Sequence, residues 1–457
     1  MDEKQAFLQA IIDDPDDDAL RLIYADWLDD HGESERAELI RVQCDLASLS
    51  ISDPRYAQLE DRSDELLFLH EKEWVEIGTV ISDLNWSRGF VEDLLLKNGR
   101  ALEDAQSAFE QHPIRNVFFG PPTQIDPASL LDSPFLDRLR SMSMGFYDPF
   151  EMPESLFTLL SSSQVKDLEK LDLSWGQSRD FMTELCKQSN APRLMHLGLE
   201  ELSTEDALSV FSPHFERLTD LDSTEGFGTD DLEILLREPN RWTGLGLNYA
   251  THSAESLKRL RSCERLERLS LRCLSDEHEL ALPTLKALTV LTTISDVAPP
   301  GIFRAIDLSQ MERLKYSWVM NPSRPATEKD WHDLEEMLQR LPGAMLHLEL
   351  DDFTGAPVAE LIRLKGVENI RALTLEMSDV SDAEVDALIE CEALTGLRSL
   401  SIESSFSAPQ LIRFAQAPLL QRVVKMRTYT DDCNDDVVNA YLESPHLKRM
   451  RALILAG

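Results

Sequence analysis

The 457-residue sequence predicts an α/β solenoid, with a curved parallel sheet inside, helices outside and an N-terminal α-helical cap. Three observations predict it. From residue 81 onward one pattern of leucines keeps returning, helix-like segments separate its copies, and the first 80 residues show only helical spacing. A unit of one strand and one helix buries its apolar side only against a neighbouring unit, so recurring units stack into one array.

Residues 1–80 are predicted to form four helices that make up a capping domain. Pro15 ends the first helix, the aspartates of the run Asp13–Asp18 cap the second, and Gly32 stops it. The apolar residues at helical spacing are Phe7, Leu8, Ile11 and Ile12; Leu20, Ile23, Tyr24, Trp27 and Leu28; Ala37, Ile40, Val42 and Leu46; and Leu59, Leu66, Leu67 and Leu69 in a fourth helix from Pro54 to about Val75.

Residues 81–457 are predicted to form a solenoid of about 15 irregular repeats, each spanning roughly 25 residues. The pattern is clearest in Leu168-Glu-Lys-Leu171-Asp-Leu173. Three repeats lack an apolar residue at one position, which leaves their strand register open, and the last repeat has a second possible start at Met450. The predicted strand starts are Val91, Ile114, Leu139, Leu168, Leu194, Leu218, Trp242, Leu266, Leu285, Leu314, Met345, Ile370, Leu397, Leu420 and Leu447, of which Leu218, Leu314 and Leu420 begin the irregular repeats.

The segments between the strands are predicted to be helical. The clearest are residues 230–237, 329–338 and 382–389, and several linkers end at a proline, as at Pro239 and Pro342. A helix that follows each strand returns the chain to the end of the sheet where that strand began, so successive strands run parallel.

Residues 81–457 resemble the leucine-rich repeat superfamily in its ribonuclease-inhibitor-like form. The segments Tyr24–Gly32 and Arg36–Gln43 are similar to the repeat-companion domain that precedes such arrays in certain bacterial proteins. Arg88–Glu92 and His112–Val117 resemble the segments that join that domain to its first repeats. The resemblance implies an architecture and no catalytic residues.

The composition disfavours several classes of partner. The chain has 83 Asp and Glu against 45 Lys and Arg, for a formal net charge of −38. Nucleic acids and anionic membranes would repel it, whereas a basic protein would be attracted, although a generally acidic proteome also explains the charge. The sequence shows no signal peptide and no apolar run of about 18 residues, and its six cysteines form no CxxC. We therefore expect a cytoplasmic protein with reduced thiols.

Motifs for catalysis and cofactor binding are not found. The chain contains no GxGxxG, P-loop, GxSxG or HExxH motif, so we predict neither an enzyme nor a cofactor. Two acidic runs, Asp276-Glu-His-Glu279 and Asp13–Asp18, are interpreted as a solvated loop and a helix cap, and no metal site is predicted.

The concave face is the predicted binding surface. Residues that alternate with the core leucines face it, and most are acidic around a basic island. The candidates are Asp172, Glu200, Asp222, Arg268, Arg272, His347, Glu349, Asp351, Glu376 and Glu403, with Lys170, His196 and Asp220 beside them. In the repeat at Leu314 the same alternation exposes Tyr316, Trp318 and Met320 as a binding hot spot. A register slip would bury these aromatic residues instead.

These observations favour a non-enzymatic intracellular module that binds a protein partner, possibly basic, on its acidic concave face. The alternative is an acidic inhibitor or nucleic-acid mimic that occupies a basic groove of its partner, with strongly salt-dependent binding. The sequence leaves open the partner, the process, the oligomeric state and whether the N-terminal helices bind anything themselves.

Overall fold

The protein is described by a computed structural model of the whole chain. The described residues are 3–50, 53–76, 81–97, 102–120, 126–145, 154–175, 180–188, 192–224, 229–247, 257–273, 285–295, 303, 307–319, 326–341, 345–353, 357–377, 380–430 and 433–456. Within these ranges, no helix combines the length and the apolar character needed to cross a membrane.

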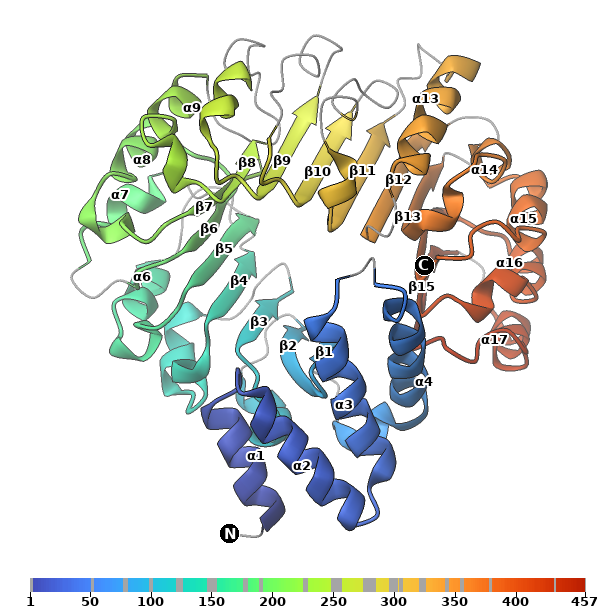
Figure 1. Cartoon of the computed structure of the whole chain (residues 1–457), viewed down its shortest axis with the longest axis horizontal. Coiled ribbons are helices and arrows are strands. Elements are labelled where there is room, and N and C mark those ends of the chain that lie inside the picture. Colours follow the sequence, from blue (N-terminus) through green and yellow to red (C-terminus); the bar gives the residue numbers. More distant parts are fainter. Residues whose placement is uncertain are drawn as a thin grey trace. The chain divides into compact units, whose positions relative to one another are not determined.

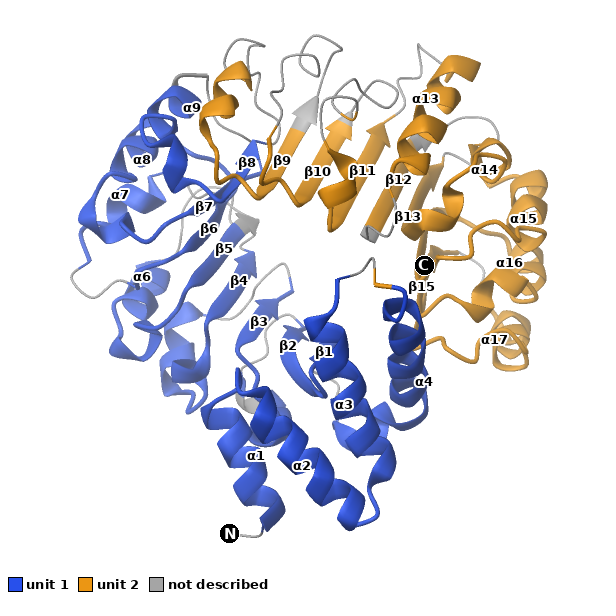
Figure 2. Ribbon diagram, viewed as in Figure 1, with its two compact units in different colours: residues 1–50, 54–251 blue, residues 51–53, 252–457 orange. Residues whose placement is uncertain are grey.

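The fold is a mixed α/β, solenoid-like repeat architecture. It contains a 16-stranded sheet in which the strand order is the order of the sequence, from β1 to β16 (Figure 1). Every strand pair with a described register is parallel except β1 and β2, which form an antiparallel hairpin. The chain divides into two compact units, Met1–Ser50 with Pro54–Thr251, and Ile51–Asp53 with His252–Gly457 (Figure 2). The boundary predicted between residues 80 and 81 stays a prediction.

Unit 1 begins with four helices where the sequence predicts them. Asp17 caps α2 by accepting a hydrogen bond from the Ala19 amide, and Gly32 follows α2 with a φ of +82°. The helices are α1 (Glu3–Asp13), α2 (Asp18–Asp30), α3 (Ser34–Ser48) and α4 (Tyr56–Trp74). The core that α1, α2 and α3 share contains Tyr24 and Ile40 and includes Phe90 from β2, so these three helices pack against the start of the sheet.

The sheet of unit 1 contains eight described strands. They are β1 (Ile81–Ser87), β2 (Phe90–Leu96), β3 (Asn116–Phe119), β4 (Ser141–Gly145), β5 (Lys170–Trp175), β6 (His196–Leu199), β7 (Asp220–Ser223) and β8 (Gly244–Leu247). The short helices between them are α5 (Gln106–Gln111), α6 (Glu154–Leu160), α7 (Phe181–Leu185), α8 (Thr204–Ser209) and α9 (Thr229–Leu235). The repeat leucines stack as ladders, for example Leu171, Leu197, Leu221 and Leu245, each at most 1% exposed.

Unit 2 continues the same alternation of strand and helix. Its strands are β9 (Arg268–Cys273), β10 (Val290–Ser295), β11 (Arg313–Val319), β12 (Met345–Phe353), β13 (Ile370–Met377), β14 (Ser399–Ser405), β15 (Lys425–Tyr429) and β16 (Ala452–Ala456). Its longer helices are α13 (Glu328–Gln339), α14 (Pro357–Leu361), α15 (Asp382–Ile389), α16 (Ala408–Phe414) and α17 (Asp435–Leu442). Capping boxes at Thr327 and Ser381 start α13 and α15, close to the predicted helix starts.

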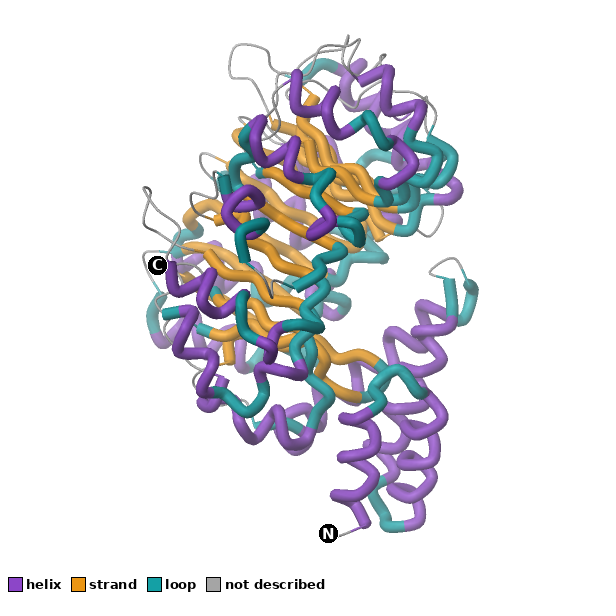
Figure 3. The backbone as a smooth tube through the Cα atoms, turned by 90° about the vertical axis from the view of Figure 1, so that its left-hand side faces the viewer, coloured by secondary structure: helices purple, strands orange, loops and turns teal. Residues whose placement is uncertain are grey.

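In each unit the helices of the repeats lie on one face of the strands (Figures 1 and 3). Side chains that point to these helices are buried leucines and other apolar residues. The opposite strand face corresponds to the predicted concave face and is called the inner face below.

Two buried arginines join the helices to the first strands within unit 1. Arg21 is fully buried, and its Nη2 donates to Glu92 Oε1 at 2.8 Å and to the Pro15 carbonyl at 2.6 Å. The guanidinium of Arg36 lies between Trp74, Trp86 and Phe90, with 4.9 to 5.1 Å from its Cζ to each ring centroid. Burial lowers the pKa of both arginines, to about 10 for Arg36. Charge pairing and cation–π contacts offset this loss of hydration.

We expect Arg21→Ala to destabilise unit 1 by about 2–4 kcal/mol, because it removes a buried guanidinium that hydrogen-bonds Glu92 and the carbonyls of Pro15 and Arg88, although Glu92 keeps its ion pair with Arg88. Hydrogen exchange of the α2 and β2 amides, read by mass spectrometry, measures this loss locally. Arg41→Ala is the matched control, since Arg41 pairs with Asp26 and Asp29 at the surface, where we expect less than about 1 kcal/mol. Equal effects of the two changes would contradict the structural role of Arg21.

His112 should make unit 1 less stable in acid. Its ring is buried, Nδ1 accepts from the Val91 amide, and burial together with the nearby Arg36 charge lowers its pKa to about 3. Between about pH 6.5 and pH 3 the unfolded chain binds a proton here that the folded chain does not, so stability falls by up to ~1.4 kcal/mol per pH unit on acidification. The free energy of unfolding of His112→Gln, measured against pH, should lack this component. If the free energy of unfolding of the wild type and of His112→Gln changed with pH in parallel, this role of His112 would be refuted.

Candidate functional site

The inner face of unit 1 carries two straight rows of residues across strands β4 to β8. Strand register fixes both rows, because each residue pairs with its neighbour in the next repeat, about 4.8 Å away. The first row is Ser141, Lys170, His196, Asp220 and Gly244, and the second is Ser143, Asp172, Gly198, Asp222 and Gly246. The rows bring together residues that lie 24 to 29 positions apart in the sequence.

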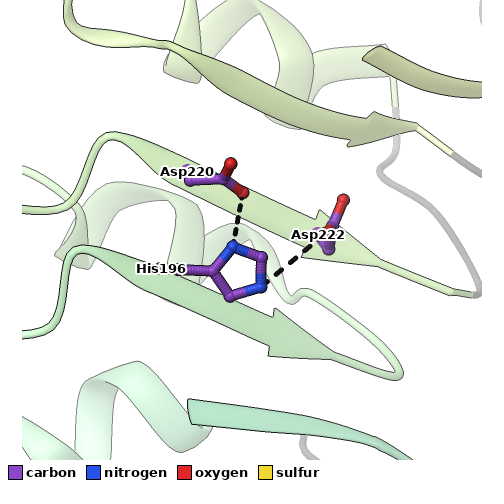
Figure 4. A group of neighbouring side chains, drawn as sticks. All are labelled: His196, Asp220 and Asp222. Atoms are coloured by element: carbon purple, nitrogen blue, oxygen red, sulfur yellow. Dashed lines mark ion pairs between the residues drawn. The ribbon is translucent and has the colours of Figure 1, made fainter. Parts of the chain in front are cut away.

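His196 lies between two carboxylates of the next strand (Figure 4). Its Nδ1 is 2.7 Å from Asp220 Oδ1, and its Nε2 is 3.8 Å from Asp222 Oδ2. The His196 side chain is 14% exposed. Its Nε2 is buried and makes no hydrogen bond to any residue that the structure describes. The three residues offer ligand atoms within 4.8 Å of one another.

Two glycines of β8 make room for these carboxylates. A Cβ atom at Gly244 would overlap the carboxylate of Asp220, and one at Gly246 would overlap that of Asp222. Leu245 and Leu247 alternate with the glycines and point into the core. The Gly-Leu-Gly-Leu sequence of β8 therefore permits both the leucine ladder and the positions of the aspartates.

Unit 2 contains a second histidine–carboxylate group with different bonding. His347 Nε2 is 3.0 Å from Thr374 Oγ1 and 3.4 Å from Glu349 Oε1, and Lys315 Nζ is 2.8 Å from the same carboxylate. Burial lowers the pKa of His347, with the Lys315 charge acting in the same direction and Glu349 opposing both. A hydroxyl and an ammonium group thus already satisfy this cluster.

The predicted concave-face residues fall into two groups. In unit 1, Asp222 lies beside His196, Asp172 pairs with Gly198, and Glu200 follows β6 directly. In unit 2, Arg268 lies on β9, His347, Glu349 and Asp351 on β12, Glu376 on β13 and Glu403 on β14. Arg272 belongs to β9 but its side chain lies outside the described residues, as does all of Met320 and the run 276–279.

The predicted hot spot at Tyr316 and Trp318 is wrong. Tyr316 is 0% and Trp318 2% exposed, and they pack edge-on against Phe303 and Trp331 in unit 2. Leu314 and Tyr316 pair with Leu291 and Thr293 of β10, which fill the second and third core positions of the preceding repeat. Leu314 and Tyr316 therefore fill the same positions in their own repeat, and that repeat starts at Met311. The predicted start was three residues late, and an odd shift exchanges the two faces of a strand. The register slip that the sequence left open is confirmed.

The same three-residue ambiguity affects other repeats. Strand pairing moves the start from Leu285 to Leu288, from Leu420 to Val423 and, as the alternative proposed, from Leu447 to Met450. As a result, the inner face of unit 2 gains basic side chains, which are Arg313, Lys315, Lys425 and Arg427. The inner face is thus mainly acidic in unit 1 and of mixed charge in unit 2.

A separate cavity of about 1000 Å³ in unit 1 lies between α1, α5 and the short helix Leu136–Arg138. Its cationic groups take part in structural contacts. Arg115 forms an ion pair with Asp16, and Arg138 donates hydrogen bonds to the carbonyls of Phe109 and His112. We find no pair of nucleophile and base among the residues that line it.

The sequence predicts that His196, Asp220 and Asp222 share one face, but it does not predict that they are neighbours. The signal is a histidine followed, 24 residues later, by Asp-x-Asp at equivalent positions of the next repeat. Two positions that are equivalent in adjacent repeats become neighbours in the sheet. The cluster is therefore encoded in equivalent positions of two adjacent repeats.

Comparison with known proteins adds no family to this description. No protein-family model matches the chain, and no curated protein is similar to it. Among solved structures, the chain is similar to that of a structural-genomics protein from Bacteroides fragilis, at 10% sequence identity and a TM-score of 0.24, over 88% of this chain and 86% of that chain. A likeness at this level identifies neither a family nor a function.

The corrected register can be tested in β11. We expect Trp318→Ala to destabilise unit 2 by about 3–5 kcal/mol, because it removes a buried aromatic side chain. Lys315→Ala, on the opposite face of the same strand, should cost less than about 1 kcal/mol. Chemical unfolding, followed by circular dichroism, compares the two. If Lys315→Ala cost more than Trp318→Ala, the faces would be assigned the wrong way round.

Proposed function

We propose that this chain is a non-enzymatic interaction module that binds a protein partner with its inner face. In this proposal it belongs to the leucine-rich repeat superfamily, and α1–α4 cap the array. The packing of α1, α2 and α3 on Phe90 of β2 supports the capping role, since an uncovered end would expose core groups to water. The pattern of leucine ladders supports the family.

The acidic patch of unit 1 supports the proposal most directly. It is defined as Asp172 on β5, Glu200 just after β6, and Asp220 and Asp222 on β7. Its cationic neighbours in the two rows are Lys170 and, when protonated, His196, so its net charge is negative. The helices of these repeats lie on the other face of the strands. The Asp220 and Asp222 side chains are 20% and 22% exposed, and a charged strand face is suited to recognise a basic surface of a folded protein.

The charge distribution favours this function over nucleic-acid mimicry. A mimic of a phosphate backbone requires closely spaced negative charges along one surface. The inner face of unit 2 instead alternates acidic residues such as Glu349 and Asp351 with Lys315, Lys425 and Arg427. This mixed pattern fits a partner that is recognised at specific positions.

The test is a charge reversal on the inner face. We expect Asp172→Lys/Glu200→Lys to weaken partner capture from native lysate about tenfold or more, a difference of roughly 1.4 kcal/mol. Because repulsion of a basic surface is electrostatic, the loss should be largest at low ionic strength. Captured protein is quantified by mass spectrometry against wild type.

Glu154→Lys/Glu205→Lys is the matched control. It changes the net charge equally but lies on helices α6 and α8, at exposed positions. Capture that the control variant retains and the inner-face variant loses would support the proposal. Equal losses in both variants would favour binding by net charge alone, and equal retention would exclude the acidic patch as the binding surface.

A further inference from the structure

We propose that His196, Asp220 and Asp222 form a binding site for a divalent transition-metal ion. This inference goes beyond the proposed function, because it concerns the isolated chain and needs no protein partner. Strands β6 and β7 hold the three residues side by side on the inner face of unit 1 (Figure 4). The bonding of the two imidazole nitrogens of His196 is what suits the group to a metal ion.

The contact with Asp220 decides which nitrogen carries the lone pair. At 2.7 Å from a carboxylate oxygen, Nδ1 of the neutral ring donates a hydrogen bond to Asp220 Oδ1. Nε2 is then an acceptor. A carboxylate that fixes the tautomer in this way is the usual partner of a metal-binding histidine, so Asp220 is a positioning residue.

The lone pair of Nε2 points toward a second acceptor. Asp222 Oδ2 is 3.8 Å away, too far for a hydrogen bond from a protonated ring. Nε2 is buried and has no hydrogen-bond partner among the described residues. Metal–nitrogen and metal–oxygen bonds of about 2.0–2.2 Å that meet at one ion separate the two ligand atoms by roughly 3–4 Å. The gap therefore suits an ion that His196 Nε2 and Asp222 both ligate.

The surrounding sheet holds this arrangement in place. A Cβ atom at position 246 would displace the Asp222 carboxylate, and one at position 244 would displace that of Asp220. The glycines at both positions leave the carboxylates in place. The three residues offer ligand atoms within 4.8 Å of one another, so Asp220 holds the ring while His196 Nε2 and Asp222 supply the protein ligands. An imidazole with carboxylates selects zinc, cobalt, nickel or manganese over calcium and magnesium. Water completes the coordination.

The test is a titration of the chelator-treated full chain, without a histidine tag, with Zn²⁺ by calorimetry and with Co²⁺ by absorption. We expect one equivalent to bind to the wild type. His196→Ala and Asp222→Asn should abolish this binding, and Asp220→Asn should weaken it about 10- to 100-fold. Gly246→Ala keeps all three residues, and it should still weaken binding at least tenfold, since the added methyl group displaces the Asp222 carboxylate.

His347→Ala is the matched control, because His347 Nε2 already contacts Thr374 and Glu349. Its metal affinity should equal that of the wild type. Circular dichroism and thermal unfolding establish that each variant is folded, and His196→Asn replaces His196→Ala if the latter is not. The titrations are done with Cys433→Ser present, because that thiol is exposed.

Three outcomes would overturn the proposal. They are no binding to the wild type at millimolar metal, equal binding by wild type and His196→Ala, or a Co²⁺ thiolate charge-transfer band in place of an imidazole–carboxylate spectrum. None of them bears on partner capture, since Asp172 and Glu200 are the residues changed there. Conversely, failure of partner capture would leave the metal titration unaffected.

Discussion

The register between neighbouring strands is the constraint on which the rest of this structure depends. One repeat cannot bury its own leucines, so each leucine must lie beside the equivalent residue of the next repeat. Leu197 lies between Leu171 and Leu221, and all three are completely buried. Once these ladders are aligned, the period of two along a strand fixes every residue of the inner face. The rows that contain His196 and the aspartates are thus a consequence of core packing on the opposite side.

Buried charge links the N-terminal helices to the sheet of unit 1. Hydrophobic packing alone would allow α2 and α3 to slide over Phe90, because apolar contacts have little directionality. The guanidinium of Arg21 must instead meet Glu92 and fixed carbonyls, and that of Arg36 needs three aromatic faces at once. Since an unpaired buried charge is strongly destabilising, these contacts select one position of the helices.

The two histidine–carboxylate groups show how neighbouring residues change the chemistry of similar side chains. Thr374 and Lys315 satisfy His347 and Glu349 in unit 2, which makes that group a closed hydrogen-bond network. Around His196, Lys170 takes the position of Lys315, but Asp222 takes that of Thr374 and Asp220 that of Ala372. Two carboxylates therefore flank an imidazole whose Nε2 has no hydrogen-bond partner in the described structure. The first arrangement stabilises the sheet, and the second is suited to a cation.

The sequence by itself determined the solenoid-like architecture, the helices at the N-terminus and the strand of each regular repeat. These features follow from local periodicity, which a single pass along the chain detects. It also placed His196, Asp220 and Asp222 on the correct face. Tertiary structure decided what periodicity leaves ambiguous. From Met311 to Trp318, apolar residues follow one another at intervals of both three and two, so two alignments fit the sequence and only pairing with β10 and β12 selects one. Only stacking of the repeats made neighbours of residues 24 positions apart, because contacts between strands are set by register and not by distance along the chain.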